Sequence, residues 1–222
     1  MTTTAKPHPT LQGLYAITPD FGGDSGTLYR QVQAALEGGV RWLQYRDKSP
    51  DHQRRSHEAA ALLALCRRHR ARLIINDDLD LARQVGADGV HLGQQDTGVG
   101  AARQQLGPQA LIGATCHDSL ELAEQAVAEG ASYCAFGRLF PSQTKPQARP
   151  APLHLLTSAR DRLGVSVVAI GGLNLHNAPA AIRAGADAVA VSGALFGATD
   201  IRAEAHLLSG LFDPAQHLEK SE

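Results

Sequence analysis

The chain has 222 residues, 43% of them hydrophobic, which is enough to bury a sizeable core in one α/β domain or in two smaller ones. Its formal net charge is -1, so it lacks the overall field that would hold a nucleic acid or an anionic membrane, and any affinity for an acidic ligand must be local. No linker rich in proline, glycine or serine divides it, and we expect one domain at 13–212 between a flexible amino-terminal tail, 1–12, and a polar carboxyl-terminal tail, 213–222.

The cysteines and the amino-terminal residues indicate the cellular compartment of the protein. Cys66, Cys116 and Cys134 lie far apart and show no Cys-x-x-Cys spacing, which favours reduced, buried thiols. Residues 1–10 contain no apolar segment, so we expect neither a signal peptide nor a membrane span there. The sequence therefore predicts a cytoplasmic protein with small-molecule partners, and it is compatible with a homo-oligomer.

Short apolar runs alternate with longer helical patterns along the chain. The runs are rich in β-branched and aromatic residues and predict strands, while the amphipathic segments between them are long enough to connect parallel strands. The predicted strands are 14–18, 42–45, 73–75, 89–92, 111–114, 133–136, 167–170 and 188–191, and the clearest helices are 28–37, 56–69, 119–129 and 177–184. This alternation indicates a parallel sheet.

A weak internal repeat favours a closed barrel over an open sheet. Glycine ends the helix before the second, fourth, sixth and eighth strands, in the segments Glu-Gly-Gly-Val, Val-Gly-Ala-Asp, Glu-Gly-Ala-Ser and Ala-Gly-Ala-Asp that begin at 37, 85, 129 and 184. Four such double units predict a single (β/α)8 TIM barrel rather than an open doubly wound sheet. In that fold the active site lies at the carboxyl ends of the strands.

The end of the second predicted strand carries Gln44, Arg46 and Lys48. Alternation along an extended chain sends these three side chains to one side and Tyr45 and Asp47 to the other. An amide, a guanidinium and an ammonium on one side form a clamp for a polyphosphate, since arginine can bind two oxygens at once. A solvated basic strand end is the alternative interpretation.

Carboxylates follow the third and fourth predicted strands. Asp77 and Asp96 lie at the ends of neighbouring strands, and Mg²⁺ prefers one or two carboxylates together with waters and phosphate oxygens. We therefore expect these two residues to ligate magnesium beside the basic clamp. An aspartate just after a strand is also a common helix N-cap, and we assign that role to Asp78 or Asp80.

The later strands predict further anion contacts. Gly171-Gly172 and Ser192-Gly193 follow the seventh and eighth strands, where barrels often bind a phosphate through backbone N–H groups. Residues 137–145, Gly-Arg-Leu-Phe-Pro-Ser-Gln-Thr-Lys, combine chain breakers, hydroxyls and an ammonium. They indicate an anion-binding loop, although a turn-rich surface loop has the same composition. The sequence thus predicts a metal-assisted diphosphate site and a separate monophosphate site.

Two other features favour structural roles. The histidines are dispersed without a zinc-ligand spacing, and His91 lies within a predicted strand, where we interpret it as structural rather than as a base. Arginines in the run 53–72 are interleaved with alanine and leucine at helical spacing. This pattern indicates a solvated outer helix face rather than a nucleic-acid patch.

Taken together, these segments resemble the thiamine-phosphate synthase family. The matching stretches lie between about residue 13 and residue 196, and they include Gln-Tyr-Arg-Asp-Lys at 44–48, Ile-Asn-Asp-Asp at 75–78, Gly-Ala-Asp-Gly-Val-His-Leu-Gly-Gln-Gln-Asp at 86–96 and Pro-Ser-Gln-Thr-Lys at 141–145. The resemblance implies a (β/α)8 transferase. It would join 4-amino-2-methyl-5-hydroxymethylpyrimidine diphosphate to a thiazole phosphate with the help of Mg²⁺ and release pyrophosphate.

The resemblance also implies a role for each matching residue. Asp77 and Asp96 would ligate magnesium, and the charges of Arg46, Lys48 and Lys145 would act in catalysis on the diphosphate. A related thiazole tautomerase, which should lack the full diphosphate set, and a non-catalytic phosphate sensor are the alternatives. The implied substrate-binding residues are Gln44, Arg46, Lys48, Asn76, Thr115, Ser142, Thr144, Lys145, Gly172, Ser192 and Gly193.

Overall fold

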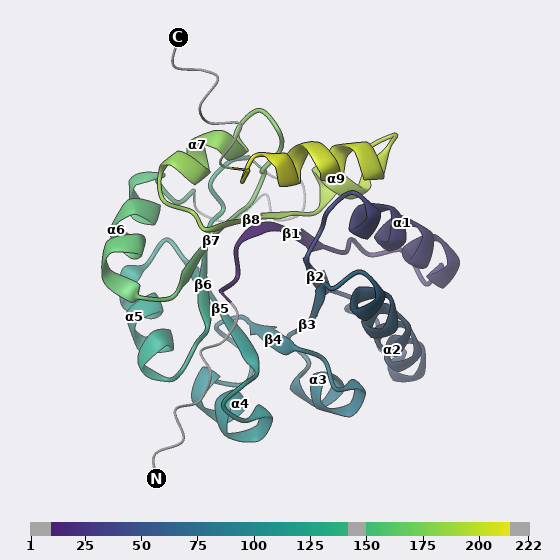
Figure 1. Cartoon of the computed structure of the whole chain (residues 1–222). Helices are drawn as coiled ribbons and strands as arrows, with labels where there is room; N and C mark the ends of the chain where they lie inside the picture. Colours follow the sequence, from purple (N-terminus) through teal and green to yellow (C-terminus); the bar gives the residue numbers. More distant parts are fainter. Residues whose placement is uncertain (1–9, 142–149, 214–222) are drawn as a thin grey trace.

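The described part of the chain forms a closed barrel of parallel strands. The computed structural model describes residues 10–141 and 150–213. Within them, eight strands pair with their neighbours in chain order, and the barrel closes where β8 (Ala188–Val191) pairs with β1 (Gly13–Ile17). Figure 1 looks along the barrel and shows the helices as a ring outside the strands. The predicted single (β/α)8 barrel is confirmed.

Strands and helices alternate around this ring. The other strands are β2 (Trp42–Tyr45), β3 (Arg72–Asn76), β4 (Gly89–Leu92), β5 (Leu111–His117), β6 (Tyr133–Phe136) and β7 (Ser166–Ile170). The helices are α1 (Ser25–Glu37), α2 (His52–Arg68), α3 (Leu79–Val85), α4 (Val99–Leu106), α5 (Leu120–Ala128), α6 (His154–Leu163), α7 (Ala178–Arg183), α8 (Gly193–Phe196) and α9 (Ile201–Gly210).

The predicted strands are all present, and β5 differs most from its predicted bounds. It continues to His117 rather than ending at residue 114, because a register shift between Thr115 and His117 keeps it paired with β6. The helices of the repeat end as predicted, with positive φ at Gly39, Gly86, Gly130 and Gly185 ahead of the even-numbered strands. The prediction that Asp78 or Asp80 caps α3 is confirmed for Asp78, whose Oδ1 accepts a hydrogen bond from the Leu81 N–H at 2.8 Å.

Side chains on each strand alternate between the barrel interior and the layer beneath the helices. On β2, Trp42 belongs to the interior cluster, whereas Leu43 and Tyr45 belong to the cluster that packs against the helices. The interior cluster comprises Leu11, Tyr15, Ile17, Trp42, Ile74, Leu111, Tyr133, Ala135, Val168, Ala188 and Ala190. The outer cluster is much larger, as expected when a ring of helices covers a barrel.

Contacts with the barrel begin before β1. Leu11 is buried in the barrel interior, and the Trp42 indole N–H donates to the Gln12 carbonyl at 3.0 Å. Residues 1–9 and 214–222, which make up most of the two predicted tails, lie outside the described residues.

The predicted state of the cysteines is confirmed. Cys66, Cys116 and Cys134 are free thiols and all three are buried. Burial raises the pKa of the Cys66 thiol to about 12, so it stays protonated. Across residues 10–141 and 150–213 we find no helix with the length and apolar character needed to cross a bilayer.

Candidate functional site

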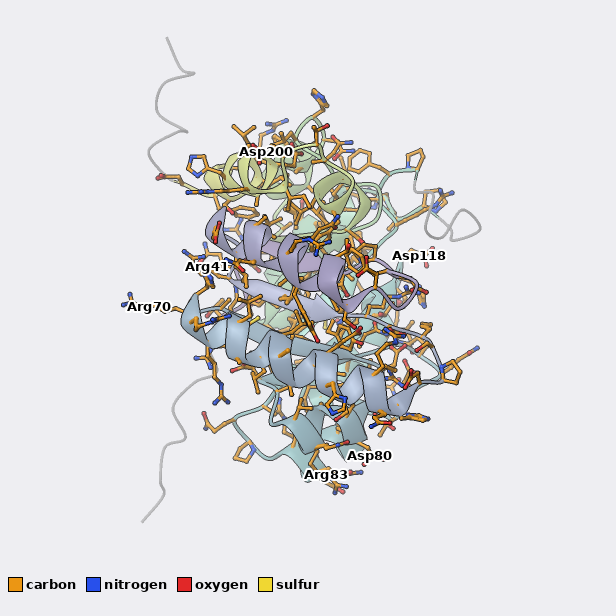
Figure 2. The ribbon with its side chains drawn as sticks, turned by 90° about the vertical axis from the view of Figure 1, so that its right-hand side faces the viewer. Arg41, Arg70, Asp80, Arg83, Asp118 and Asp200 are labelled. Carbon is orange, nitrogen blue, oxygen red and sulfur yellow. The ribbon has the colours of Figure 1, made fainter. Side chains whose placement is uncertain are left out.

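The candidate site lies at the carboxyl ends of the strands. Figure 2 shows the barrel from the side: Arg41 and Arg70, which precede β2 and β3, lie at one end, and Asp118, which follows β5, lies at the other. The loops that carry the predicted site residues all leave the barrel at the end that Asp118 marks. The fold therefore brings segments distant in sequence to one face of the barrel.

Lys48, Asp77 and Asp96 come together at this end of the barrel. Lys48 Nζ lies 3.1 Å from Asp77 Oδ2, and the carboxyl groups of Asp77 and Asp96 share a hydrogen bond. Asp96 Oδ2 also accepts a hydrogen bond from the Gly93 N–H at 2.8 Å, within its own loop. These three residues follow β2, β3 and β4, so neighbouring strands place them side by side, as expected from the sequence.

The two carboxyl groups have opposite pKa shifts. Burial alone would raise the pKa of Asp77, but the hydrogen bond with Asp96 and the charge of Lys48 hold it below its usual value. Burial and the neighbouring Asp77 carboxylate raise the pKa of Asp96, despite the hydrogen bond from Gly93. The pair therefore ionises in two steps, because the first negative charge disfavours the second.

The backbone directs Asp77 toward these partners. Asp77 has φ 61°, and its N–H donates to the His91 carbonyl of β4 at 2.8 Å. A left-handed conformation at an aspartate is uncommon and is concentrated at functional sites. It turns the chain sharply between β3 and α3, so that Asp77 faces Lys48 while Asp78 caps the helix.

A chain of hydrogen bonds runs through the barrel interior to the same end. Gln44 Nε2 donates to the Tyr15 hydroxyl at 2.8 Å, and the Tyr15 and Tyr133 hydroxyls lie 2.8 Å apart. Tyr133 Oη is 3.1 Å from His91 Nδ1, and His91 Nε2 is 2.9 Å from Thr115 Oγ1. The predicted structural role of His91 is confirmed by these contacts. The chain joins Gln44 to Thr115, two of the predicted substrate contacts.

Arg46 and Asn76 keep their polar groups available. The Arg46 backbone is held, because its N–H donates to Thr18 Oγ1 at 2.8 Å. Neither the Arg46 guanidinium nor the Asn76 amide hydrogen-bonds with another side chain in the part of the sequence that the structure describes. Both side chains are partly exposed. In the sequence, Arg46 is two residues before Lys48 and Asn76 directly precedes Asp77.

The ends of β7 and β8 form a second, glycine-rich region. Two hydrogen bonds attach the segment after β6 to β7: Leu139 N–H donates to Ile170 O at 3.0 Å, and Phe140 N–H donates to Gly171 O at 3.1 Å. Gly172, with φ 66°, lies so close to this segment that a Cβ there would be 2.3 Å from the Pro141 carbonyl oxygen. The β6 and β7 loops are thus packed backbone to backbone.

Ser192 and Gly193 open the short helix α8. Ser192 is its N-cap residue and Gly193 is exposed, with open space where a Cβ would lie. Within the described ranges, no hydrogen bond or ion pair joins Gly172, Ser192 or Gly193 to Lys48, Asp77 or Asp96. Ser142, Thr144 and Lys145 lie outside the described residues, so their predicted roles remain predictions.

Two arginines of α2, Arg54 and Arg55, pair with carboxylates of the loops at the candidate site. The interpretation of the run 53–72 as a solvated face is wrong for Arg54 and Arg55, whose side chains are only 21% and 12% exposed. Arg54 pairs with Asp47 at 2.7 Å, and Arg55 pairs with Asp78 at 2.7 Å. Helical spacing is the signal that could have found Arg55, which lies four, seven and eleven residues before the buried Ala59, Leu62 and Cys66. The partners after β2 and β3 are visible only in the fold.

The chain is similar to known proteins over most of its length. The sequence model of the family described as Thiamine monophosphate synthase matches residues 14–195. The chain is 55% identical over 204 residues to the thiamine-phosphate synthase of Chromobacterium violaceum, covering 92% of this chain and 98% of that protein. It is 54% identical over 203 residues to that of Thioalkalivibrio sulfidiphilus, with 91% and 96% covered.

The chain also resembles a solved structure whose name belongs to the same activity. The thiamine phosphate pyrophosphorylase of Pyrococcus furiosus superimposes with a TM-score of 0.81 at 34% identity, covering 90% of this chain and 95% of that one. The sequence match, the shared fold and the cluster of Lys48, Asp77 and Asp96 at the strand ends point the same way. The chain therefore belongs to the thiamine monophosphate synthase family.

Proposed function

We propose that this chain is a transferase that joins a pyrimidine diphosphate to a thiazole phosphate, forming thiamine phosphate and releasing pyrophosphate. Its membership of the family supports the reaction. The single structural observation that carries the proposal is the group formed by Lys48, Asp77 and Asp96 at the barrel mouth. One ammonium beside two carboxyl groups is suited to a metal-bound diphosphate.

The two carboxyl groups fit a divalent cation. Asp77 and Asp96 share a hydrogen bond and have opposite pKa shifts, which is the behaviour of two acids too close to ionise independently. Asp77 and Asp96 would hold the cation, and its positive charge would offset the repulsion between the two carboxylates. The structure has no cluster of three or more metal-binding side chains within residues 10–141 and 150–213, which suits Mg²⁺, because it usually keeps several waters and phosphate oxygens. When bound, Mg²⁺ would neutralise charge on the diphosphate.

The chain's own cations would assist the departure of the diphosphate. We infer a dissociative path, in which the bond between the pyrimidine methylene carbon and the diphosphate oxygen breaks and both electrons leave with the oxygen. Arg46, Lys48 and Lys145 would stabilise the negative charge that grows on this oxygen, and Asn76 would orient the diphosphate. The aminopyrimidine ring would share the positive charge left on the carbon, with Gln44 and Thr115 beside it.

The thiazole would then complete the reaction. Its ring nitrogen carries no proton, so it can form the new carbon–nitrogen bond without a catalytic base. Gly172 and the Ser192-Gly193 backbone, with Ser142 and Thr144, would bind its phosphate and hold the nitrogen in line with the carbon. The main contributions of the protein are therefore charge stabilisation and alignment of the two substrates.

A single incubation tests this function. The chain is mixed with both phosphorylated substrates, with Mg²⁺ or with a chelator, and thiamine phosphate and pyrophosphate are measured. We expect equal amounts of both products with Mg²⁺ and neither with the chelator. Equilibrium binding of both substrates without any product would overturn the proposal and support a non-catalytic sensor.

A further inference from the structure

Arg54 of α2 is bonded to the loop that carries the proposed diphosphate clamp. Its guanidinium lies 2.7 Å from Asp47 Oδ2 and 3.0 Å from Glu58 Oε1, and it donates to Ser49 Oγ at 2.7 Å. The Glu58 side chain is 2% exposed and that of Asp47 is 7% exposed. Ion pairs with so little contact with water have defined geometry, because breaking one leaves a charge buried without a partner.

Asp47 lies between Arg46 and Lys48 in the sequence, so whatever holds Asp47 also holds them. Its second oxygen, Oδ1, accepts from the Ser49 N–H at 2.6 Å and closes a turn directly after Lys48. Burial alone would raise the pKa of Asp47, but the hydrogen bonds from Ser49 and the ion pair with Arg54 keep it below its usual value. Asp47 is thus charged and bonded on both oxygens, one to Arg54 of α2 and the other to the Ser49 N–H.

Arg55, the next residue of α2, is bonded to the neighbouring loop in the same way. Its guanidinium lies 2.7 Å from Asp78 Oδ2, while Asp78 Oδ1 caps α3 through the Leu81 N–H at 2.8 Å. Asp78 directly follows Asp77, the proposed metal ligand. Arg55 Nε is buried without a hydrogen-bond partner among the described residues. Holding the arginine here therefore costs the free energy of removing that N–H group from water.

We propose that Arg54 and Arg55 are positioning residues that align the proposed diphosphate and metal loops with each other. Arg54 acts through Asp47 on Arg46 and Lys48, and Arg55 acts through Asp78 on Asp77. Because both arginines belong to one rigid helix, the contact of 3.1 Å between Lys48 and Asp77 is set by α2. The inference rests on the function proposed above, since it assigns these loops to a magnesium-bound diphosphate.

The barrel offers a matched control at its other end. Asp88 Oδ1 lies 2.7 Å from the guanidinium of Arg72, and Asp88 Oδ2 accepts from the Leu73 N–H at 2.9 Å. In Asp47, Asp78 and Asp88 alike, one oxygen accepts from the backbone and the other pairs with an arginine. Changing any of them to asparagine can keep the backbone hydrogen bond and removes only the ion pair.

The experiment compares Asp47→Asn, Asp78→Asn and Asp88→Asn in the full chain. Binding of inorganic pyrophosphate with Mg²⁺ is measured by calorimetry, together with the KM of each substrate, the Mg²⁺ concentration for half-maximal rate, and Tm. We expect Asp47→Asn to weaken pyrophosphate binding and raise the pyrimidine diphosphate KM on the order of tenfold, as for loss of an outer-shell partner. Asp78→Asn should raise the Mg²⁺ requirement by a similar factor. The thiazole phosphate KM should change in neither variant.

The control separates positioning from stability. We expect Asp88→Asn, whose partner Arg72 is 51% exposed, to lower Tm less than the other two variants and to leave pyrophosphate binding unchanged. If all three bind pyrophosphate like the unaltered chain, or all three lose affinity in proportion to Tm, the inference is wrong. If either asparagine variant fails to fold, Arg54→Lys or Arg55→Lys is measured instead, and the same comparison decides. An unaltered chain that forms no thiamine phosphate would contradict the proposed function itself.

Discussion

The carboxyl group of Asp96 affects both metal binding at the site and the stability of the chain. Its carboxyl has a raised pKa because burial and the neighbouring Asp77 carboxylate both disfavour its charge. A carboxyl that tends to keep its proton is poorly solvated as an anion, and a divalent cation relieves this better than water does. The same group should therefore favour metal binding and destabilise the metal-free chain.

The first prediction concerns Asp96→Ala. We expect turnover to be lost at a Mg²⁺ concentration that saturates the unaltered chain, because Asp77 alone holds the ion poorly against a charged diphosphate. The Mg²⁺ concentration for half-maximal rate should rise by more than roughly 10–100-fold. That range is typical for loss of a residue that only hydrogen-bonds to a metal ligand. A Mg²⁺ titration of the initial rate checks this, and an unchanged curve would mean that Asp96 only accepts the hydrogen bond from Gly93.

The second prediction concerns Asp96→Asn without metal. Since the folded pKa of Asp96 is raised, the unfolded chain loses this proton first, and stability falls as pH rises from about 4. Asparagine does not titrate, can still accept from the Gly93 N–H, and can donate to Asp77. We measure the Tm of both proteins in chelator and subtract that of the unaltered chain from that of Asp96→Asn. This difference should increase as pH rises above about 4. A difference independent of pH would show that the Asp96 pKa is not raised.

At the scale of the elements, the loops after β6 and β7 act as one unit. Leu139 and Phe140 bond to the end of β7, and Gly172 fits against the Pro141 carbonyl with no room for a side chain. A change at Gly172 should therefore displace the segment that leads to Ser142 and Thr144 in the sequence, although those two residues lie outside the described ranges.

The third prediction is that Gly172→Ala raises the thiazole phosphate KM and leaves the pyrimidine diphosphate KM unchanged. The matched control is Gly164→Ala. Gly172 and Gly164 have φ of 66° and 64°, so alanine costs each about 1–2 kcal/mol of backbone strain. Only Gly172 would also collide with a neighbouring backbone, since a Cβ at Gly164 meets nothing within 4 Å. Steady-state kinetics and Tm of both variants check this. An equal thiazole phosphate KM in Gly172→Ala and Gly164→Ala would contradict it.

At the scale of the whole molecule, a polar chain crosses the barrel core. Tyr133 is central to it, since its hydroxyl contacts both Tyr15 and His91 while its ring stacks on His91. The fold makes room for Tyr133 through Gly113, where a Cβ would lie 2.0 Å from the ring. Through Tyr133, strands β1, β4, β5 and β6 are held in one arrangement.

The fourth prediction is that Tyr133→Phe lowers the free energy of unfolding by about 1–3 kcal/mol, because buried groups of Tyr15 and His91 lose a partner. Burial strongly raises the pKa of Tyr133, so its hydroxyl is present as a neutral donor and acceptor. Tyr29→Phe, at a partly exposed tyrosine, should change stability much less. Denaturant unfolding of both variants tests this, and equal losses would show that the interior contacts contribute nothing beyond the lost hydroxyl.

The sequence by itself determined the architecture. Each strand is buried on both faces, so its run of apolar residues is visible without the fold, and each crossover helix has the length that parallel strands need. It also determined which residues lie at the mouth, because in a barrel every strand carries its next residues to the same end. Lys48, Asp77 and Asp96 could be grouped for this reason alone.

Only the tertiary structure decided which side chains support them. Helical spacing places Arg54 and Arg55 at the buried face of α2. It does not show that two neighbouring loops supply Asp47 and Asp78 to pair with them. Likewise, Gln44 and Thr115 lie far apart in sequence and are joined through Tyr15, Tyr133 and His91 inside the barrel. Ion pairs and interior hydrogen bonds depend on distances across the fold, whereas periodicity along a chain records only which face a residue occupies.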